Sequence, residues 1–305
     1  MKKLLLFGIL FLQLLVADTR EGNDIDKVNA ATVNTLLIFT SQEGLNSGKY
    51  TFTNTPVDVN MDIYHLPLTY QLKTDTLLNY FIVGNVGYSR VYLGDIKEEV
   101  PPEYHLDKLN HIQTYTAGFG GGARYEILDK LYVSAGIEFI YSRAGVSVRD
   151  EEGVAKDFFN KNYSDNISYK IFSLLEYRPI WYEFKPYATL GYKLFETKSD
   201  FSFDETFSFD SESSVTSLSL GAESPKLYSF GKQNITLEAY ITAHYLSGIV
   251  REVVDFDLYR SIGAVIYYNT PAGPWWASRF FIEANTVDSN GLEGYNFGIG
   301  FTMDF

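Results

Sequence analysis

The sequence predicts an all-β fold, a transmembrane antiparallel up-and-down β-barrel of 12 strands. Three observations predict it: an export signal at the N-terminus, an alternation of apolar and polar residues that recurs to the last residue, and connections that alternate between short and long. The 24 Tyr and 23 Phe coexist with a mean hydropathy of only −0.10. A barrel reconciles these values, because one face of each strand meets lipid and the other meets water or polar groups.

The composition excludes several other classes of protein. None of the 305 residues is Cys, and the formal net charge is −13. Without Cys, the chain can form neither a disulfide scaffold nor a thiolate metal site. The acidity argues against nucleic acid as a partner, because phosphate binding needs a basic face.

The N-terminus has the features of a secretory signal peptide. Lys2 and Lys3 precede an apolar run over 4–16, and the small Ala17 follows this run. The run is shorter than the about 20 residues that a membrane-spanning helix needs. We therefore expect three segments: a signal peptide over 1–17, a short periplasmic or plug segment over 18–30, and an outer-membrane barrel over 31–305.

A period of two defines the strands of the expected barrel. In the run that contains Tyr115, Phe119 and Tyr125, the apolar residues alternate with Thr and Gly, so each set occupies one strand face. Patterns of this kind place strands at 31–40, 57–72, 76–93, 110–127, 130–148, 165–179, 184–200, 213–224, 233–249, 257–269, 276–287 and 293–305.

The connections between these strands alternate in length, as they do in bacterial barrels with short periplasmic turns and long external loops. The expected periplasmic turns are 73–75, 128–129, 180–183, 225–232 and 270–275. The expected external loops are 41–56, 94–109, 149–164, 201–212, 250–256 and 288–292. Trp181, Trp275 and Trp276 all fall at the expected periplasmic rim, where an aromatic girdle belongs.

A soluble β-sandwich would also show alternation, with its apolar face in the core. The runs here commonly exceed 12 residues, whereas strands of soluble proteins are usually about 5–6 residues long. The length of the runs therefore favours the barrel, and a mature chain that is soluble without detergent would favour the sandwich.

The final strand carries a recognisable pattern, in which apolar residues alternate to the end of the chain: Tyr295, Phe297, Ile299, Phe301, Met303 and Phe305. It resembles the C-terminal signature by which the barrel assembly machinery recognises bacterial outer-membrane β-barrel proteins. Within that class, the strand count and the segment 66–70 are similar to the solitary autotransporter-like β-barrel domain family.

The resemblance implies a place in the outer membrane of a Gram-negative bacterium. Its expected partners are outer-membrane lipid, lipopolysaccharide and, during insertion, the assembly machinery. It also implies a non-enzymatic protein that acts as a narrow channel or as a surface structural or interaction protein. Autotransporters carry a large passenger before the barrel, and the short 18–30 segment makes a passenger of its own unexpected here.

Isolated charges on the polar strand faces are candidates for the lumen, because charges facing lipid would be costly. They are Arg124, Glu126, Glu138, Glu176, Arg178, Glu238, Arg279 and Glu283. Two interpretations are open: the charges pair with one another and close the lumen, or they form a selectivity lining for a small solute.

An outer-membrane hydrolase acting on lipid or lipopolysaccharide is the alternative function. The four His residues lack metal-ligand spacing, and Ser247 follows His244 by three residues rather than the two of outer-membrane phospholipases. The glycine-rich 118–123 run reads as lumen-facing strand residues, since no helix is expected after it. We therefore expect no catalytic residue, no metal and no cofactor.

Overall fold

The structure is a computed structural model. It describes residue 38 and residues 45–53, 57–72, 77–96, 109–149, 155–156, 163–201, 209–270 and 278–302. The strands that it contains are β1 (Leu45–Phe52), β2 (Val57–Leu72), β3 (Leu78–Ile96), β4 (Leu109–Leu128), β5 (Leu131–Arg149), β6 (Ala155–Lys156), β7 (Tyr163–Tyr177), β8 (Lys185–Phe201), β9 (Phe209–Glu223), β10 (Tyr228–Phe230), β11 (Gln233–Gly248), β12 (Leu258–Asn269), β13 (Arg279–Ser289) and β14 (Leu292–Thr302). One helix, α3 (Ile249–Val254), lies between β11 and β12.

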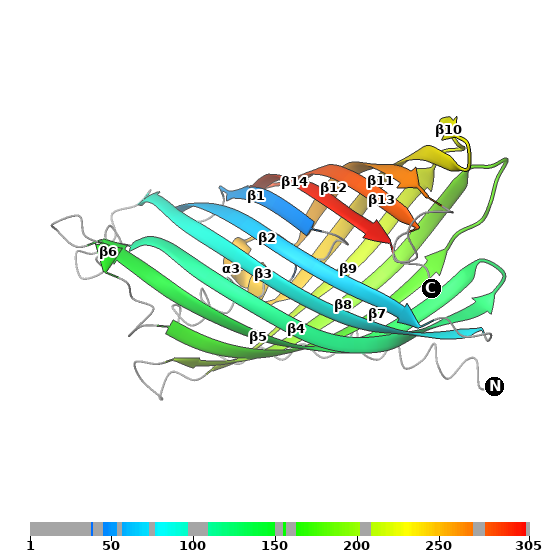
Figure 1. Ribbon diagram of the computed structural model, residues 1–305. Helices are drawn as coiled ribbons and strands as arrows, with labels where there is room; N and C mark the ends of the chain where they lie inside the picture. The colour runs from blue at the N-terminus through cyan, green and yellow to red at the C-terminus, as the bar shows by residue number, and fades with distance from the viewer. Residues whose placement is uncertain are drawn as a thin grey trace.

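Twelve of these strands form a closed antiparallel barrel, and β6 and β10 are short additions to it (Figure 1). Each long strand pairs with its neighbours in sequence, and β14 pairs with β1 to close the cylinder. In sequence, 12 residues separate β3 from β4 and 13 separate β5 from β7; these strand ends lie at one end of the barrel, and the 129–130 turn lies at the other. By the usual asymmetry of these barrels, the first end is external and the second is periplasmic.

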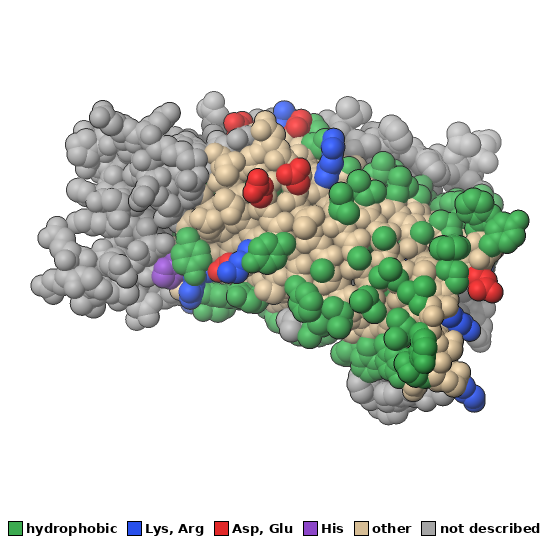
Figure 2. Space-filling view, turned by 90° about the horizontal axis from the view of Figure 1, so that it is seen from above, with side chains coloured by type: hydrophobic (Ala, Val, Ile, Leu, Met, Phe, Trp, Pro, Cys, Tyr) green, Lys and Arg blue, Asp and Glu red, His purple; other side chains and the backbone are tan. Residues whose placement is uncertain are grey.

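The outer wall carries a band of apolar side chains, as the alternation predicts. Tyr115, Phe119 and Phe139 are 51%, 66% and 53% exposed, although they are aromatic residues of central strands. Figure 2 shows hydrophobic side chains gathered over one part of the wall, with acidic side chains nearer the external end. A band of this kind is stable only against lipid, so the barrel spans a membrane.

The start of the barrel differs from the expectation. The predicted strand at 31–40 lies outside the described residues except for Ile38, which is helical, and the first strand is β1, within the predicted 41–56 loop. The pattern of β1 is inverted, since Tyr50 and Phe52 face the interior while Lys49 points outward. A search for lipid-facing alternation therefore passes over it.

The strand β1 is also short. It has 8 residues against 16 in β2, and it pairs with β2 only from Val59 to His65. The remaining part of β2, up to Leu72, pairs only with β3 among the described residues.

The predicted external loop 250–256 is also wrong in part, because it contains most of α3. Val250 and Val254 of this helix are buried, as is Phe256 after it. The helix therefore turns into the barrel mouth instead of extending into solvent. Among the described residues, no helix is long and apolar enough to cross a membrane.

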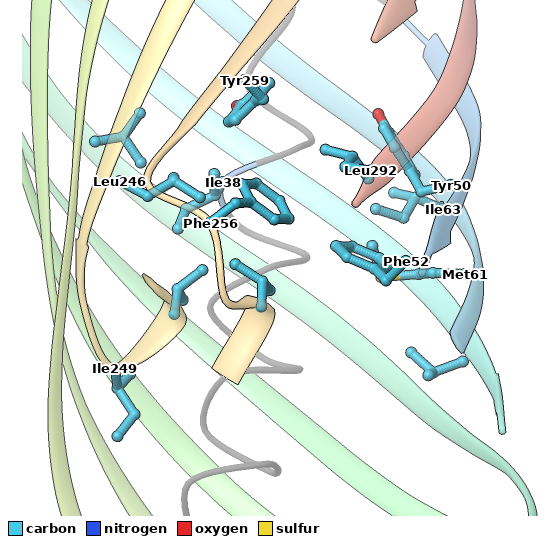
Figure 3. Packing of buried hydrophobic residues seen from close by; sticks show 14 of the residues in the cluster. Ile38, Tyr50, Phe52, Met61, Ile63, Leu246, Ile249, Phe256, Tyr259 and Leu292 are labelled. Carbon is cyan, nitrogen blue, oxygen red and sulfur yellow. The ribbon is translucent and has the colours of Figure 1, made fainter. Parts of the chain in front are cut away.

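All the described buried apolar residues except Val265 and Phe281 form one cluster inside the external half of the barrel, in which Phe256 stacks on Phe52 with ring centroids 6.3 Å apart. Figure 3 shows side chains from α3 and its flanking residues pointing toward side chains of β1, β2 and β14. Leu246, Val250 and Leu292 within the cluster are fully buried. The external half of the lumen is thus packed like the core of a soluble protein.

Candidate functional site: the barrel lumen

The wall of the lumen has aromatic side chains lying flat over glycines of the next strand. A Cβ on Gly221 would come within 2.5 Å of the Tyr187 ring, and one on Gly263 within 2.4 Å of the Tyr240 ring. Glycine leaves the space that each ring occupies, so the tyrosine hydroxyls reach carboxylates one strand further on.

The first ionic group sits midway along the lumen, around the buried Glu138. Lys170 on the paired strand β7 donates to this carboxylate with an N···O distance of 2.6 Å. Asn85 on β3 also donates to it. Glu138 is 2% exposed, so these donors replace the water that it loses.

A second ionic group lies at the periplasmic end. Arg124 of β4 and Arg178 both pair with the Glu176 carboxylate of β7, the former at 2.8 Å. The Arg124 guanidinium also lies over the Tyr132 ring, 4.1 Å from its centroid. One carboxylate therefore forms ion pairs with two guanidinium groups along the wall.

A third ionic group involves β8, β9 and β13. Lys185 and Arg279 pair with Glu223 at 3.0 and 2.9 Å. Thr236 also donates to this carboxylate, at 2.9 Å. Glu223 is 4% exposed and is satisfied from three strands, so this group also fixes the positions of neighbouring side chains.

Two further carboxylates are held by tyrosine hydroxyls. Tyr187 and Tyr267 donate to Glu238 at 2.7 and 3.0 Å, and Tyr240 donates to Glu283. Both carboxylates are buried, at 8% exposure each.

Seven of the predicted lumen charges take part in these three ionic groups or in the tyrosine–carboxylate pairs, while Glu126 accepts from the backbone of Lys130 at the periplasmic turn. Their role in closing the lumen or selecting a solute stays a prediction.

The sequence interpretation missed Asn85, Lys170, Lys185, Lys193 and Glu223. Strand parity could have found Lys170, which lies six residues from Glu176 on the same strand, but β3, β8 and β9 contain no predicted lumen charge from which to count.

The residues of the predicted assembly signal lie on the outer face of β14. Tyr295, Phe297, Ile299 and Phe301 are 57%, 50%, 44% and 43% exposed. Met303 and Phe305 lie outside the described residues. Recognition by the assembly machinery stays a prediction.

Trp181 lies in the turn between β7 and β8 and is 68% exposed. Trp275 and Trp276 lie outside the described residues. The same holds for the signal peptide and for the 18–30 segment.

A cavity of about 330 Å³ occupies the lumen on the periplasmic side of the apolar cluster. Tyr50, Tyr259 and Val287 belong to both the cluster and the cavity lining, so the cluster forms the external wall of the cavity. Polar residues such as Lys193 and Glu238 line other parts of it. Its volume lies at the lower end of the range for small-molecule sites.

His244 lines this cavity and contacts two serines. Its Nδ1 lies 2.8 Å from the Ser217 hydroxyl, and its Nε2 lies 3.4 Å from the Ser261 hydroxyl. The ring stacks on Tyr259 with centroids 4.3 Å apart. Among the described residues no carboxylate bonds to the ring, and no group of three His, Cys, Asp or Glu could hold a metal ion.

Solved structures share this fold at low sequence identity. The translocator domain of the autotransporter NalP from Neisseria meningitidis is 11% identical, with 91% of this chain and 98% of that domain covered and a TM-score of 0.59. The β-domain of the Bordetella autotransporter BrkA is also 11% identical, with 86% and 99% covered and a TM-score of 0.52. No protein-family model and no curated protein matches the chain.

These likenesses are to barrel domains of the outer membrane, and at this identity they establish the fold alone. Together with the lipid-facing band, they define the chain as an outer-membrane β-barrel with the architecture of an autotransporter translocator domain. The predicted fold class and localisation are confirmed.

Proposed function

We propose that the chain is a non-enzymatic narrow channel for small polar solutes, closed on its external side by α3 in the conformation described here. One observation carries the proposal: an apolar cluster fills the external half of the lumen, while ion-paired walls and a cavity lined by both polar and apolar residues occupy the rest.

The periplasmic part of the lumen suits passage of a polar solute. Its ion pairs join neighbouring or next-neighbouring strands, as with Glu138 and Lys170 on β5 and β7, and Arg279 of β13 reaches Glu223 of β9 over two intervening strands. Paired charges present the solute with a polar surface on which each carboxylate is already balanced by a cation.

The external part suits a gate. The segment that carries α3 leaves β11 at Gly248, whose φ is 76°, and Asp255 after the helix has a φ of 55°. A left-handed backbone at each end of α3 sets the sharp turns that bring it into the mouth. Displacement of α3 would remove Val250, Val254 and Phe256 from the pathway.

Planar-bilayer recordings test the channel. We expect wild type to be mostly closed, and a variant with Val250, Val254 and Phe256 replaced by Ser to conduct at least tenfold more often, because its plug loses apolar burial. Leu258→Ser is the matched control, since Leu258 follows the same segment but is 41% exposed. A boiled-versus-unboiled gel shift verifies folding, and a folded triple variant as silent as wild type would favour a structural or interaction role.

The Ser217–His244 contact makes the hydrolase a second candidate, since a base within hydrogen-bond reach can activate a serine. We expect the folded protein to release no fatty acid from phospholipid or lipopolysaccharide above the background of Ser217→Ala. Turnover that is lost in Ser217→Ala and kept in Ser247→Ala would overturn the non-enzymatic proposal.

A further inference from the structure

Lys193 is a cation of the lumen that the ionic groups do not use. It lies on β8, faces the interior and lines the cavity. Among the residues that the structure describes, it makes no hydrogen bond and no ion pair. It interacts electrostatically with Lys170 and Glu138, and those two already pair with each other.

The other cations of the lumen each have a carboxylate partner: Lys170 pairs with Glu138, Arg124 and Arg178 with Glu176, and Lys185 and Arg279 with Glu223. Around Glu138, two ammonium groups face one carboxylate. This side of the cavity therefore has two amino groups for one carboxylate, and a second ammonium group withdrawn from bulk water is costly unless an anion accompanies it.

The wall next to Lys193 is hollowed by small residues. Gly191, two positions along the same face of β8, pairs with Ser217 of β9, and Thr189 pairs with Ser219. All four residues line the cavity with Lys193. They leave room in front of the ammonium group and supply hydroxyl groups that can donate hydrogen bonds.

We propose that Lys193 anchors a binding site in this cavity for a small organic carboxylate. The anion would pair with the ammonium group and receive hydrogen bonds from the adjacent hydroxyls. The cavity volume of about 330 Å³ limits the ligand to a small molecule.

The other end of the cavity selects for a single negative charge. Glu238 and Glu283 line it there and are both buried. Their charges repel a second anionic group, so inorganic phosphate, which is partly a dianion at neutral pH, fits less well than a monocarboxylate. The binding site goes beyond the proposed channel, because occupancy does not require conduction.

Isothermal titration of the full folded protein in detergent micelles tests the site, with lactate, inorganic phosphate and choline as separate probes. We expect saturable binding of lactate and none of choline. Lys193→Met, which keeps the length of the side chain and removes its charge, should weaken lactate binding at least tenfold. Lys198→Met is the matched control, because Lys198 lies on β8 with an exposed, outward-facing side chain, and it should bind as wild type does.

Each result of the titration bears on a different part of the proposal. Equal lactate binding by wild type and folded Lys193→Met would overturn the site, as would the absence of lactate binding by wild type. Phosphate binding in place of lactate would overturn the carboxylate assignment. Lysine-dependent binding by a protein that is silent in bilayers would support this site and count only against the channel.

Discussion

The two halves of the lumen are lined by the same strands, yet different interactions stabilise them: apolar packing in one and ion pairs in the other. In the external half, buried apolar residues from the wall meet α3 and Phe256 at the centre. In the periplasmic half, carboxylates such as Glu176 and Glu223 pair along the wall with cations of nearby strands. The first arrangement fills the barrel across its width, and the second stiffens the wall and leaves a cavity.

The difference teaches how one barrel can be both closed and polar. Apolar packing is non-directional, so any side chain that fills the space contributes to the external plug. Charged groups need specific partners, and the lumen supplies these from other strands of the wall, as β7 does for Glu138 and β13 for Glu223. Closure and the polar pathway therefore depend on separate sets of residues, which can be changed independently.

The largest expected effect comes from emptying the apolar half. Phe52→Ala removes a ring that is 4% exposed and stacks on Phe256, so it should lower the free energy of unfolding by about 3–5 kcal/mol. Urea titration of the refolded barrel in lipid vesicles measures this change. Phe230→Ala, at a ring in β10 that is 52% exposed, should cost far less, and equal losses would contradict the packed plug.

A smaller effect is expected from breaking one ion pair of the polar half. Lys170→Met leaves Glu138 without its 2.6 Å partner, and we expect a loss of about 2 kcal/mol. The loss stays below the largest values for buried pairs because Asn85 still donates to the carboxylate.

The double variant Glu138→Gln/Lys170→Met provides the control for this pair. It removes both charges, so it should recover most of the stability that Lys170→Met alone loses in the same urea titration. A double variant as unstable as the single one would mean that Lys170 acts through packing and not through its charge.

The smallest effect belongs to an ion pair on the outer wall near the external end. Arg143 donates to Asp165 at 2.7 and 2.9 Å, and Tyr141 also donates to it. Burial raises the pKa of the Asp165 carboxyl, but hydrogen bonds from Arg143 and Tyr141 outweigh it and hold the pKa below its usual range.

A lowered pKa stabilises the fold above the ordinary carboxyl pKa of about 3.9, and this contribution is lost as the pH falls through the pKa of the folded state. Because the pair is exposed, Asp165→Asn should cost at most about 1 kcal/mol at pH 7. Unfolding titrations at pH 7 and pH 3 should show the difference from wild type shrinking in acid. A constant difference would assign the effect to packing.

Lipid-facing alternation was sufficient to predict 11 of the 12 long strands, because a period of two with aromatics on one face is visible without tertiary information. The strand β1 and the helix α3 were not predicted. Tyr50, Phe52, Val250 and Phe256 are buried in one cluster across the barrel mouth. Sequence spacing does not show which residues meet there. The same limit applies to the lumen, where Lys193 is visible in the sequence but its lack of an ion-pair partner among the described residues is not.

The shortness of β1 has a consequence for the order of folding. Closure requires β1 to pair with β14, and Tyr50 and Asn296, which bond across this seam, are 246 residues apart. The neighbouring hairpins need only local contacts and can form first, whereas closure of so long a loop has a high entropic cost and comes late. With only 8 residues in β1, the seam has 8 paired residues to offset that cost, against 11 between β13 and β14. We therefore expect pairing of the first and last strands to be the slow step in folding of the barrel.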